Sequence, residues 1–433
     1  MNPEPLSIQL ELLEKENARL RRALEELSIL NEVASAISST STLKEVVDLT
    51  VQKCVKHLNV EQGSVSLFGN EESSPLRTMV RKVRTDVDAI PYRLGDQLTG
   101  WMLKNQSPLV VNDLAHDGRF QFGNDAASAI GSLMAVPLRL KGRMIGVLSV
   151  FNKQSADGFS NGDQRLLSII AAQSAQVIEN ARLLEEEKAL QRVQQELQTA
   201  HTIQMNLLPK SAPKVPGFEI AGRTLPARNV GGDYFDYLWS DPNRLTVCLG
   251  DVSGKGIAAA LVMASVHATI RGQSMLEHSP SECLRWTNQL LRQTTDSATF
   301  VTMFYAVINT ETRELKYSNG GHNPPFVISQ AGESRSLTEG GVVLGLLPDV
   351  TYGEASHTLK AGDLVLIYSD GFSEAMNRRF EEYGEHRLLE TLIANRAASA
   401  EAIIDRCFTA VKEHCGDAPQ TDDMTMVAVR VNQ

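Results

Sequence analysis

Residues 246–265 read TVCLGDVSGKGIAAALVMAS, which is an apolar run, a glycine-rich turn with one lysine, and an alanine-rich stretch. This order predicts a strand, a tight turn and a helix, the arrangement in which many proteins hold phosphate groups. A P-loop has four residues between its glycines and a Ser or Thr after the lysine. Here three residues separate Gly250 from Gly254, and Gly256 follows Lys255. The stretch is therefore not a P-loop.

Acidic residues recur at the ends of the neighbouring apolar runs. Asp251 lies in the opening stretch, and the others are Asp233 in NVGGDYFD, Asp370 in IYSDGFSEA, and Asp422 with Asp423 in QTDDMTMV. One Asp beside Gly usually marks a turn, but repeated placement at strand ends predicts several carboxylates in one cleft. Crowded carboxylates repel one another unless they are protonated or held by cations, and oxygen ligands favour Mg²⁺ or Mn²⁺. Two such cations can activate a water and polarise a phosphoryl group.

Other phosphatase chemistries lack their signatures. The five cysteines are dispersed, which predicts reduced core thiols rather than disulfides or a zinc site: Cys54, Cys248, Cys283, Cys407 and Cys415. None has an arginine six positions later, as a cysteine-dependent phosphatase would require. An aspartyl-phosphate enzyme would want an Asp-x-Asp pair, and Asp233 and Asp236 are one residue too far apart.

Length and composition predict a soluble protein of two to three domains. The chain has 433 residues, 42% of them hydrophobic and 22% charged, with a formal net charge of −10. The acidic balance argues against nucleic acid or an anionic membrane as the main partner. No apolar run approaches the ~20 residues of a spanning helix, and the N-terminus lacks a signal-peptide pattern. We therefore expect a cytoplasmic location.

The N-terminal region has the pattern of one long helix over residues 8–37. Its seam residues alternate at steps of three and four: Leu10, Leu13, Asn17, Leu20, Leu24, Leu27, Asn31 and Ala34. Paired asparagines at one heptad position can fix a parallel dimer. We assign residues 1–28 to a coiled-coil helix and expect a homodimer. A single amphipathic helix packed on its own domain is the alternative.

Residues 29–182 alternate strand and helix patterns, with a hairpin expected around a Lys-Gly turn. Through SLMAVPL, IGVLSVFNK and the helix that follows, the block resembles a GAF sensory domain. An Asn-Lys…Phe…Asp-Glu pattern, which accompanies cyclic-nucleotide binding in some GAF domains, is matched at Asn152, Lys153, Phe159 and Asp163, whereas Gln164 replaces the glutamate. The structural alternative is a Lys153–Asp163 ion pair that ties down the loop. The pattern is compatible with a small-molecule ligand of this domain, but the sequence does not identify one.

Residues 183–210 extend the last helix of that block as a helical connector. Its heptad seam is interrupted by Glu186 and Gln204, and it consists of Leu183, Leu190, Val193, Leu197, Ala200 and Leu207. Such a coiled coil would be only marginally stable. A small free-energy contribution from the sensory domain could therefore decide whether it forms. Pro209, Pro213 and Pro216 end it.

The remaining chain, residues 211–433, mixes hairpin patterns with paired helical blocks, which predicts an α+β fold with antiparallel sheets. The expected helices span residues 256–278, 281–293, 385–395 and 400–414. Residues 188–433 resemble the PPM-type, metal-dependent serine/threonine phosphatases, in the bacterial branch of stage II sporulation protein E and the stress-sigma-factor regulators. The motifs, in family order, are AHTIQMNLLP, GRTLPARNVGGDYFDY, GDVSGKGIAAAL, TFVTMFYAVI, NGGHNPPFV, LGLLPD, YSDGFSEA and DDMTMVAVR.

This resemblance implies a phosphatase β-sandwich flanked by helices, with catalytic roles for Asp251, Asp233 and Asp370. Asp251 would bridge two divalent cations, Mn²⁺ or Mg²⁺, and the carbonyl of Val252 would be a further ligand. Asp233 would complete the second metal, and Asp370 with Asp422 the first. The family aligns its metal ligand with Asp422 rather than Asp423.

The implied reaction is hydrolysis of phosphoserine or phosphothreonine on a partner protein by a metal-activated water. The implied substrate is a phosphorylated anti-sigma-factor antagonist of the STAS type, and the GAF domain would regulate the reaction through the connector. The alternative is a signalling scaffold that binds the phosphoprotein without turnover. His322 is either a general acid or a loop histidine fixed by its neighbours. Lys255 is expected to be a solvated side chain, with contact to the substrate phosphate as the alternative.

Overall fold

The computed structural model describes residues 10–17, 20, 28, 42–68, 76–82, 92–120, 130–276 and 278–432. The chain folds as two compact units, Met1–Arg192 and Val193–Gln433. Residues 10–17 are helical and exposed. Half of the predicted N-terminal seam, namely Leu24, Leu27, Asn31 and Ala34, lies outside the described residues. The coiled coil therefore stays a prediction.

The first unit is an antiparallel sheet with helices on it. The strand order is β2-β1-β5-β4-β3, with β1 Val60–Phe68, β2 Leu76–Lys82, β3 Leu109–Val111, β4 Leu133–Leu140 and β5 Arg143–Lys153. The helices are α2 Leu43–Leu58, α3 Tyr92–Asn105 and α4 Asn161–Leu207. The expected hairpin joins β4 to β5, and Lys141 and Gly142 both adopt positive φ, as a two-residue hairpin turn requires. Apolar side chains of α2 and α4 form one core with the sheet.

The second unit contains two antiparallel sheets, apart from one short parallel pair. The first has the order β13-β10-β9-β8-β7, with β14 also paired to β10, and the second has the order β12-β11-β15-β16-β6. Their bounds are β6 Phe218–Leu225, β7 Tyr234–Asp241, β8 Arg244–Val252, β9 Val301–Asn309, β10 Glu314–Gly320, β11 Phe326–Ile328, β12 Ser334–Ser336, β13 Gly340–Gly341, β14 Ala355–Thr358, β15 Leu364–Tyr368 and β16 Met424–Val431. Strands β9 and β10 form a hairpin, and so do β11 and β12, in agreement with the hairpin patterns FVTMFYAVINTETRELKYSN and PPFVISQAGESRSLTEG of the sequence.

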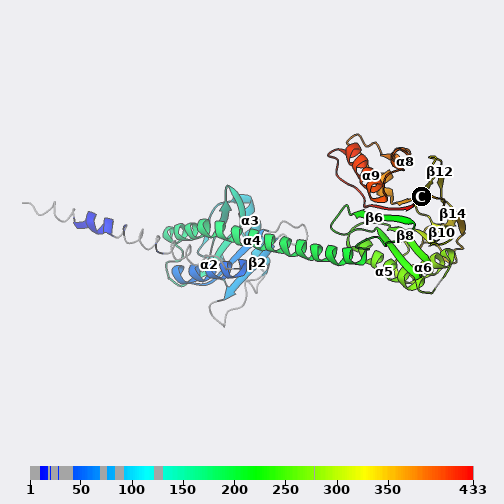
Figure 1. The fold of residues 1–433 in the computed structure, drawn as a ribbon. Helices are drawn as coiled ribbons and strands as arrows, with labels where there is room; N and C mark the ends of the chain where they lie inside the picture. Colours follow the sequence, from blue (N-terminus) through cyan, green and yellow to red (C-terminus); the bar gives the residue numbers. More distant parts are fainter. Residues whose placement is uncertain are drawn as a thin grey trace, which may run out of the picture. The chain divides into compact units, whose positions relative to one another are not determined.

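Helices cover the outer faces of these two sheets, as Figure 1 shows. They are α5 Ile257–Ser274, α6 Pro280–Thr294, α7 Asp370–Ser373, α8 Gly384–Asn395 and α9 Ala400–Cys415. Strand β15 is buried on both faces, since Val365 and Ile367 join the core between the sheets whereas Leu366 and Tyr368 join the core under α8 and α9. Burial on both faces explains why this strand reads as an unbroken apolar run. The α+β fold is as predicted.

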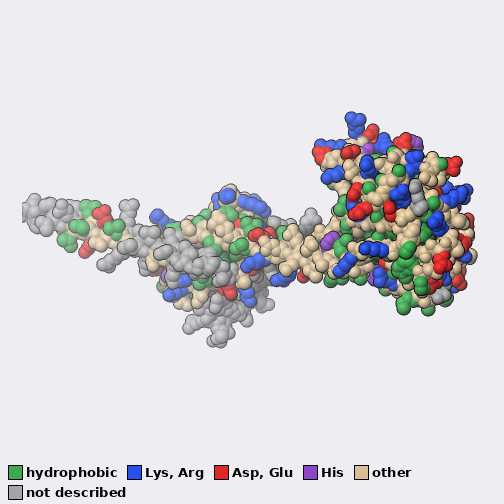
Figure 2. Space-filling model, viewed as in Figure 1, with side chains coloured by type: hydrophobic (Ala, Val, Ile, Leu, Met, Phe, Trp, Pro, Cys, Tyr) green, Lys and Arg blue, Asp and Glu red, His purple; other side chains and the backbone are tan. Residues whose placement is uncertain are grey.

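The cysteines are reduced, as their dispersed positions predict. All five cysteines are free thiols, and four of them are buried. Burial raises the pKa of the Cys54 thiol to about 12. Basic and acidic side chains alternate over the face shown in Figure 2. Within the described ranges, no helix combines the length and the hydrophobicity needed to cross a bilayer.

Candidate functional site

The five acidic residues identified in the sequence lie at one end of the two sheets of the second unit. Strands β7 and β8 pair with Tyr234 opposite Gly250, which puts Asp233 and Asp251 at the same end of that hairpin. Strands β15 and β16 pair with Tyr368 opposite Met426, so Asp370 and Asp422 also lie at a common end. The structure therefore brings the residues together from four chain segments.

Burial and the repulsion between neighbouring carboxylates raise the pKa of Asp233, Asp251 and Asp370. Burial, followed by the charges of Asp370, Asp422 and Asp423, raises the pKa of Asp251 to about 8. Burial and the charge of Asp251 raise the pKa of Asp233 well above its ordinary value. Burial, Asp422 and Glu374 raise the pKa of Asp370 to about 6. Groups whose charge is this costly at neutral pH are the kind of site that a cation stabilises.

Asp233 is a buried carboxylate whose oxygens lack hydrogen-bond partners among the described residues. The Thr425 and Ser369 hydroxyls lie near enough to this carboxylate to lower its pKa in part, but Ser369 donates to the Asp423 carbonyl at 3.1 Å and the Thr425 hydroxyl lies 2.7 Å from that of Thr224. A buried carboxylate without partners costs several kcal/mol. The residue therefore fits a metal ligand better than a structural acid.

The Val252 carbonyl oxygen, which is expected to be a further metal ligand, lies so close to Gly232 that this position has no space for a side chain. A Cβ atom at this position would come within 2.8 Å of the Val252 carbonyl oxygen and 3.2 Å of Asp251 Oδ1. The carbonyl and the carboxylate thus face the same small space beside Asp233. All donors in this set are oxygens, which suits Mg²⁺ or Mn²⁺. Within the described residues, no group of three or more Asp, Glu, His or Cys side chains is arranged so that it could hold a metal ion as it stands, so the carboxylates would have to move closer together around a cation.

Asp422 and Asp423 are neighbours with different contacts. Asp423 is buried and accepts hydrogen bonds from the backbone N–H groups of Ala227 at 2.8 Å and Gly232 at 2.6 Å. Its carboxylate therefore fixes the loop before β7. Asp422 is less buried and pairs with the Lys255 ammonium at 2.7 Å. Asp422 Oδ1 also accepts from the Asp423 N–H at 2.9 Å, so both of its oxygens have partners, although it is the more exposed of the two residues.

Lys255 is exposed, as expected, and it also pairs with a residue of the acidic cluster. Its ammonium contacts Asp422 Oδ2 and also donates to the Thr421 carbonyl oxygen at 2.6 Å. The flexible stem lets the positive group reach the nearest carboxylate of the cluster. The rest of the turn is as expected, because Gly254 and Gly256 both adopt positive φ and Gly256 is the N-cap of α5.

His322 and Asp236 lie in the core and have structural contacts. His322 is buried, its Nδ1 lies 2.8 Å from the Thr302 hydroxyl, and burial lowers its pKa to about 4. It is therefore a neutral, fixed loop histidine at physiological pH. Asp236 is fully buried on β7 and accepts two hydrogen bonds from the Arg271 guanidinium, at 2.8 and 3.2 Å. Its charge is thus neutralised by a helix residue.

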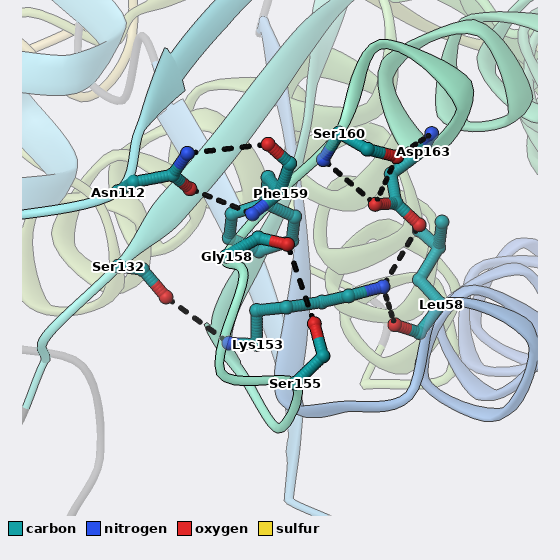
Figure 3. Close-up of polar contacts among 9 residues, drawn as sticks. All are labelled: Leu58, Asn112, Ser132, Lys153, Ser155, Gly158, Phe159, Ser160 and Asp163. Carbon is teal, nitrogen blue, oxygen red and sulfur yellow. Dashed lines mark hydrogen bonds and ion pairs between the residues drawn. The ribbon is translucent and has the colours of Figure 1, made fainter.

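In the first unit, three residues of the Asn-Lys…Phe…Asp pattern, Lys153, Phe159 and Asp163, form the loop contacts shown in Figure 3. Lys153 Nζ pairs with Asp163 Oδ1 at 2.8 Å and donates to the Leu58 carbonyl oxygen at 2.8 Å. Asp163 Oδ2 also accepts from the Ser160 N–H, just before α4 begins. The Asn112 side-chain amide accepts a hydrogen bond from the Phe159 N–H and donates one to the Phe159 carbonyl oxygen. The structural alternative for this pattern is thus confirmed.

Replacing Asp163 with alanine should lower the stability of this unit by about 2 kcal/mol. The variant loses an ion pair that is largely buried and the hydrogen bonds that begin α4. Thermal unfolding followed by calorimetry measures the loss, and the neighbouring Gln164→Ala serves as the control with an expected change under about 0.5 kcal/mol. Equal melting temperatures for the two variants would contradict the role assigned to the ion pair.

Comparison with known proteins gives the class of both units. Residues 241–432 match the family described as Stage II sporulation protein E (SpoIIE), and residues 40–179 match the family described as GAF domain. The chain therefore carries a GAF domain and a PPM-type phosphatase domain of the stage II sporulation protein E type. Phosphatases of this class are metal-dependent hydrolases.

Two curated proteins illustrate the relationship. Protein IcfG of Synechocystis sp. is 30% identical over 264 residues, which cover 55% of this chain and 42% of that protein. Phosphoserine phosphatase RsbU of Bacillus subtilis is 29% identical over 242 residues, which cover 55% of this chain and 71% of that protein. The chain thus spans less than half of the first relative.

A solved structure supports the fold of the second unit. The SiaA-PP2C domain of Pseudomonas aeruginosa aligns with a TM-score of 0.50 at 21% identity, and the alignment covers 56% of this chain and 99% of that domain. At this identity the likeness shows the fold alone. The sequence-based expectation of a phosphatase sandwich agrees with it.

Proposed function

We propose that this protein is a metal-dependent phosphatase that hydrolyses phosphoserine or phosphothreonine on a partner protein. The observation that carries the proposal is the Asp233 carboxylate, buried without a hydrogen-bond partner beside Asp251 among the described residues. A catalytically silent scaffold would have no need to maintain so costly a group.

In this proposal two divalent cations, Mn²⁺ or Mg²⁺, are held by the oxygens of the acidic cluster. Asp251 would contact both, with the Val252 carbonyl and Asp233 at one cation and Asp370 with Asp422 at the other. When bound, such cations supply an activated water and neutralise charge on the phosphoryl group. Asp251, Asp233 and Asp370 are the catalytic residues of the proposal.

The surrounding chain would keep this cluster in place. Asp423 holds the loop before β7 through two backbone N–H groups. The Ser253 hydroxyl accepts from the Phe300 N–H at 2.9 Å, and the Ser253 N–H donates to the Phe300 carbonyl at 2.9 Å. These bonds anchor the turn after β8, so that the Asp251 carboxylate and the Val252 carbonyl face one space.

The substrate of the proposal is a phosphorylated anti-sigma-factor antagonist with a STAS-type fold. It is supported by the family match and by a relative whose name is phosphoserine phosphatase. The test uses the full chain and a phosphoserine form of such an antagonist, with release of inorganic phosphate as the measurement. We expect turnover with Mn²⁺ and none with EDTA. Binding of the phosphoprotein without phosphate release would favour the scaffold alternative.

We further propose that the GAF domain regulates this activity through helix α4 in a homodimer. Three seam residues of the connector are exposed in the single chain, Leu183 by 50%, Leu190 by 65% and Val193 by 53%. Leucines this exposed at heptad spacing are typical of a face that a second helix covers. The signal or ligand of the GAF domain would then act by stabilising or loosening the paired helices.

Glutamate at both Leu190 and Leu197 should disrupt the paired connector. Losing two apolar contacts of about 1.5 kcal/mol each should raise the dimer dissociation constant by about 100-fold. Sedimentation equilibrium measures this change, and phosphate release should fall in the same variant. Glutamate at the exposed Gln191 and Gln194 adds the same charge beside the seam and is the control. Unchanged association and activity in the seam variant would refute the coupling.

A further inference from the structure

Gln204, the residue that interrupts the connector seam, makes a two-way contact with the loop before the acidic cluster. Its side chain is buried. Its Nε2 donates to the Gly231 carbonyl oxygen at 2.7 Å, and its Oε1 accepts from the Gly231 N–H at 3.0 Å. An amide side chain has both a donor and an acceptor, so it satisfies the backbone N–H and the backbone carbonyl of one residue at once. The contact lies entirely within the second unit.

The segment from Gly231 to Asp233 is packed on its other side against the cluster. A Cβ atom at Gly231 would lie 2.2 Å from Asp423 Oδ2, and one at Gly232 would lie 2.8 Å from the Val252 carbonyl oxygen. The Gly232 N–H donates to Asp423 Oδ2 at 2.6 Å. With contacts this close there is no free space into which the backbone could shift independently. A displacement of Gly231 must therefore move Asp233, two residues later.

The end of α4 is held firmly enough to transmit such a displacement. Leu208 is buried in the core of the second unit, and Met205 packs against that core. The His201 Nδ1 lies 2.6 Å from the Asn229 carbonyl oxygen, one turn before Gln204 on the same helix. Residues 201–208, about the last two turns of α4 and the residue that follows it, thus contact either the core or residues 229–231.

We propose that Gln204 is a positioning residue that couples the end of helix α4 to the metal ligand Asp233. This inference rests on the proposed metal site and adds the route by which the connector acts on it. A rotation or shift of α4 changes the Gln204–Gly231 contact, which changes the position of the Asp233 carboxylate and hence the affinity for the metal. By linkage, metal binding at Asp233 favours the helix position seen here.

The first test replaces Gln204 with leucine in the full chain and measures Mn²⁺ binding by isothermal titration calorimetry. Leucine is of similar size but leaves both Gly231 groups unpaired. We expect Mn²⁺ affinity to fall by about 10-fold or more, as for other residues that orient a metal ligand. At limiting Mn²⁺ the kcat should fall while KM for the phosphoprotein is unchanged, and excess Mn²⁺ should restore most of the kcat.

The matched control is Thr202→Val, which removes an exposed hydroxyl that bonds only within α4, to the Gln198 carbonyl at 3.0 Å. Its Mn²⁺ affinity should equal that of the wild type. Wild-type affinity in a folded Gln204→Leu protein would overturn the proposal. If Asp251→Ala also left Mn²⁺ binding intact, the metal assignment itself would fail, so the two failures are distinguishable.

A second measurement needs no variant and covers the case in which Gln204→Leu does not fold. The ¹⁵N-labelled wild-type chain is titrated with Mg²⁺, and the signals of the Gln204 side-chain amide and the Gly231 N–H are followed. Both should shift and saturate together with metal binding, whereas the Thr202 N–H should respond less. Signals of Gln204 and Gly231 that do not respond to saturating Mg²⁺ would contradict the coupling.

Discussion

Replacing Asp251 with alanine is expected to lower Mn²⁺-dependent phosphoserine hydrolysis by about 1,000-fold or more. This carboxylate lies among Asp233, Asp370 and Asp422, and its burial, followed by the charges of the last two, raises its pKa. In the proposed site it is the one ligand shared by both cations, so its removal should cost several kcal/mol of transition-state stabilisation, and each 1.4 kcal/mol is about tenfold in rate. Release of inorganic phosphate at saturating substrate measures the effect.

The fold of this variant should be intact, because removing one of several crowded carboxylates relieves repulsion. Melting in EDTA should therefore occur at the wild-type temperature or above. Asp417→Ala is the matched control, since its side chain is 71% exposed and forms only a surface ion pair with Arg378. Turnover in Asp251→Ala close to that of the control would exclude the binuclear assignment.

Replacing Arg271 with methionine is expected to destabilise the second unit by about 3 kcal/mol. The Asp236 side chain is 1% exposed, and the variant would leave its charge without a cation. The Arg271 side chain is 48% exposed, so its guanidinium keeps much of its hydration in the folded state. The loss of stability therefore comes mainly from the Asp236 carboxylate that is left without a cation. For a unit of this size the change corresponds to a fall in melting temperature of about 6–12 °C. Calorimetry on the full chain measures it.

A double variant separates the stranded charge from lost packing. Asp236→Asn combined with Arg271→Met removes both charges, and it should recover part of the stability lost in Arg271→Met. Arg271→Lys keeps a positive charge but loses the two-pronged contact, so its loss should be smaller. A double variant no more stable than Arg271→Met would show that packing, rather than the ion pair, dominates at this position.

Local signals in the sequence were sufficient for the hairpins, the helices and the acidic strand ends. The Lys141-Gly142 turn, with both residues at positive φ, follows from local turn chemistry, and so do the glycines around Lys255. The spacing of apolar residues in a strand or helix depends on whether one face or both faces are buried. This spacing is visible within each segment of the sequence. The acidic positions could be identified because each interrupts an apolar run at its end.

The partners of polar side chains could not be predicted in the same way. Lys255 reads as a solvated residue, yet it pairs with Asp422, which lies in a distant segment of the chain. Asp423 and Asp422 look equivalent in the sequence, but only Asp423 accepts the backbone N–H groups of Ala227 and Gly232. No local pattern encodes such contacts, because they depend on which segments the sheets bring to one end.

Gln204 shows this division most clearly. The heptad pattern by itself determined that this position is a polar break in the connector seam, since its side chain cannot contribute an apolar contact there. Only the tertiary structure decided what the break is for, because the Gly231 backbone that it bonds lies in a separate loop. Periodicity is a property of consecutive residues, whereas a buried hydrogen bond requires two segments to meet at a fixed distance and angle.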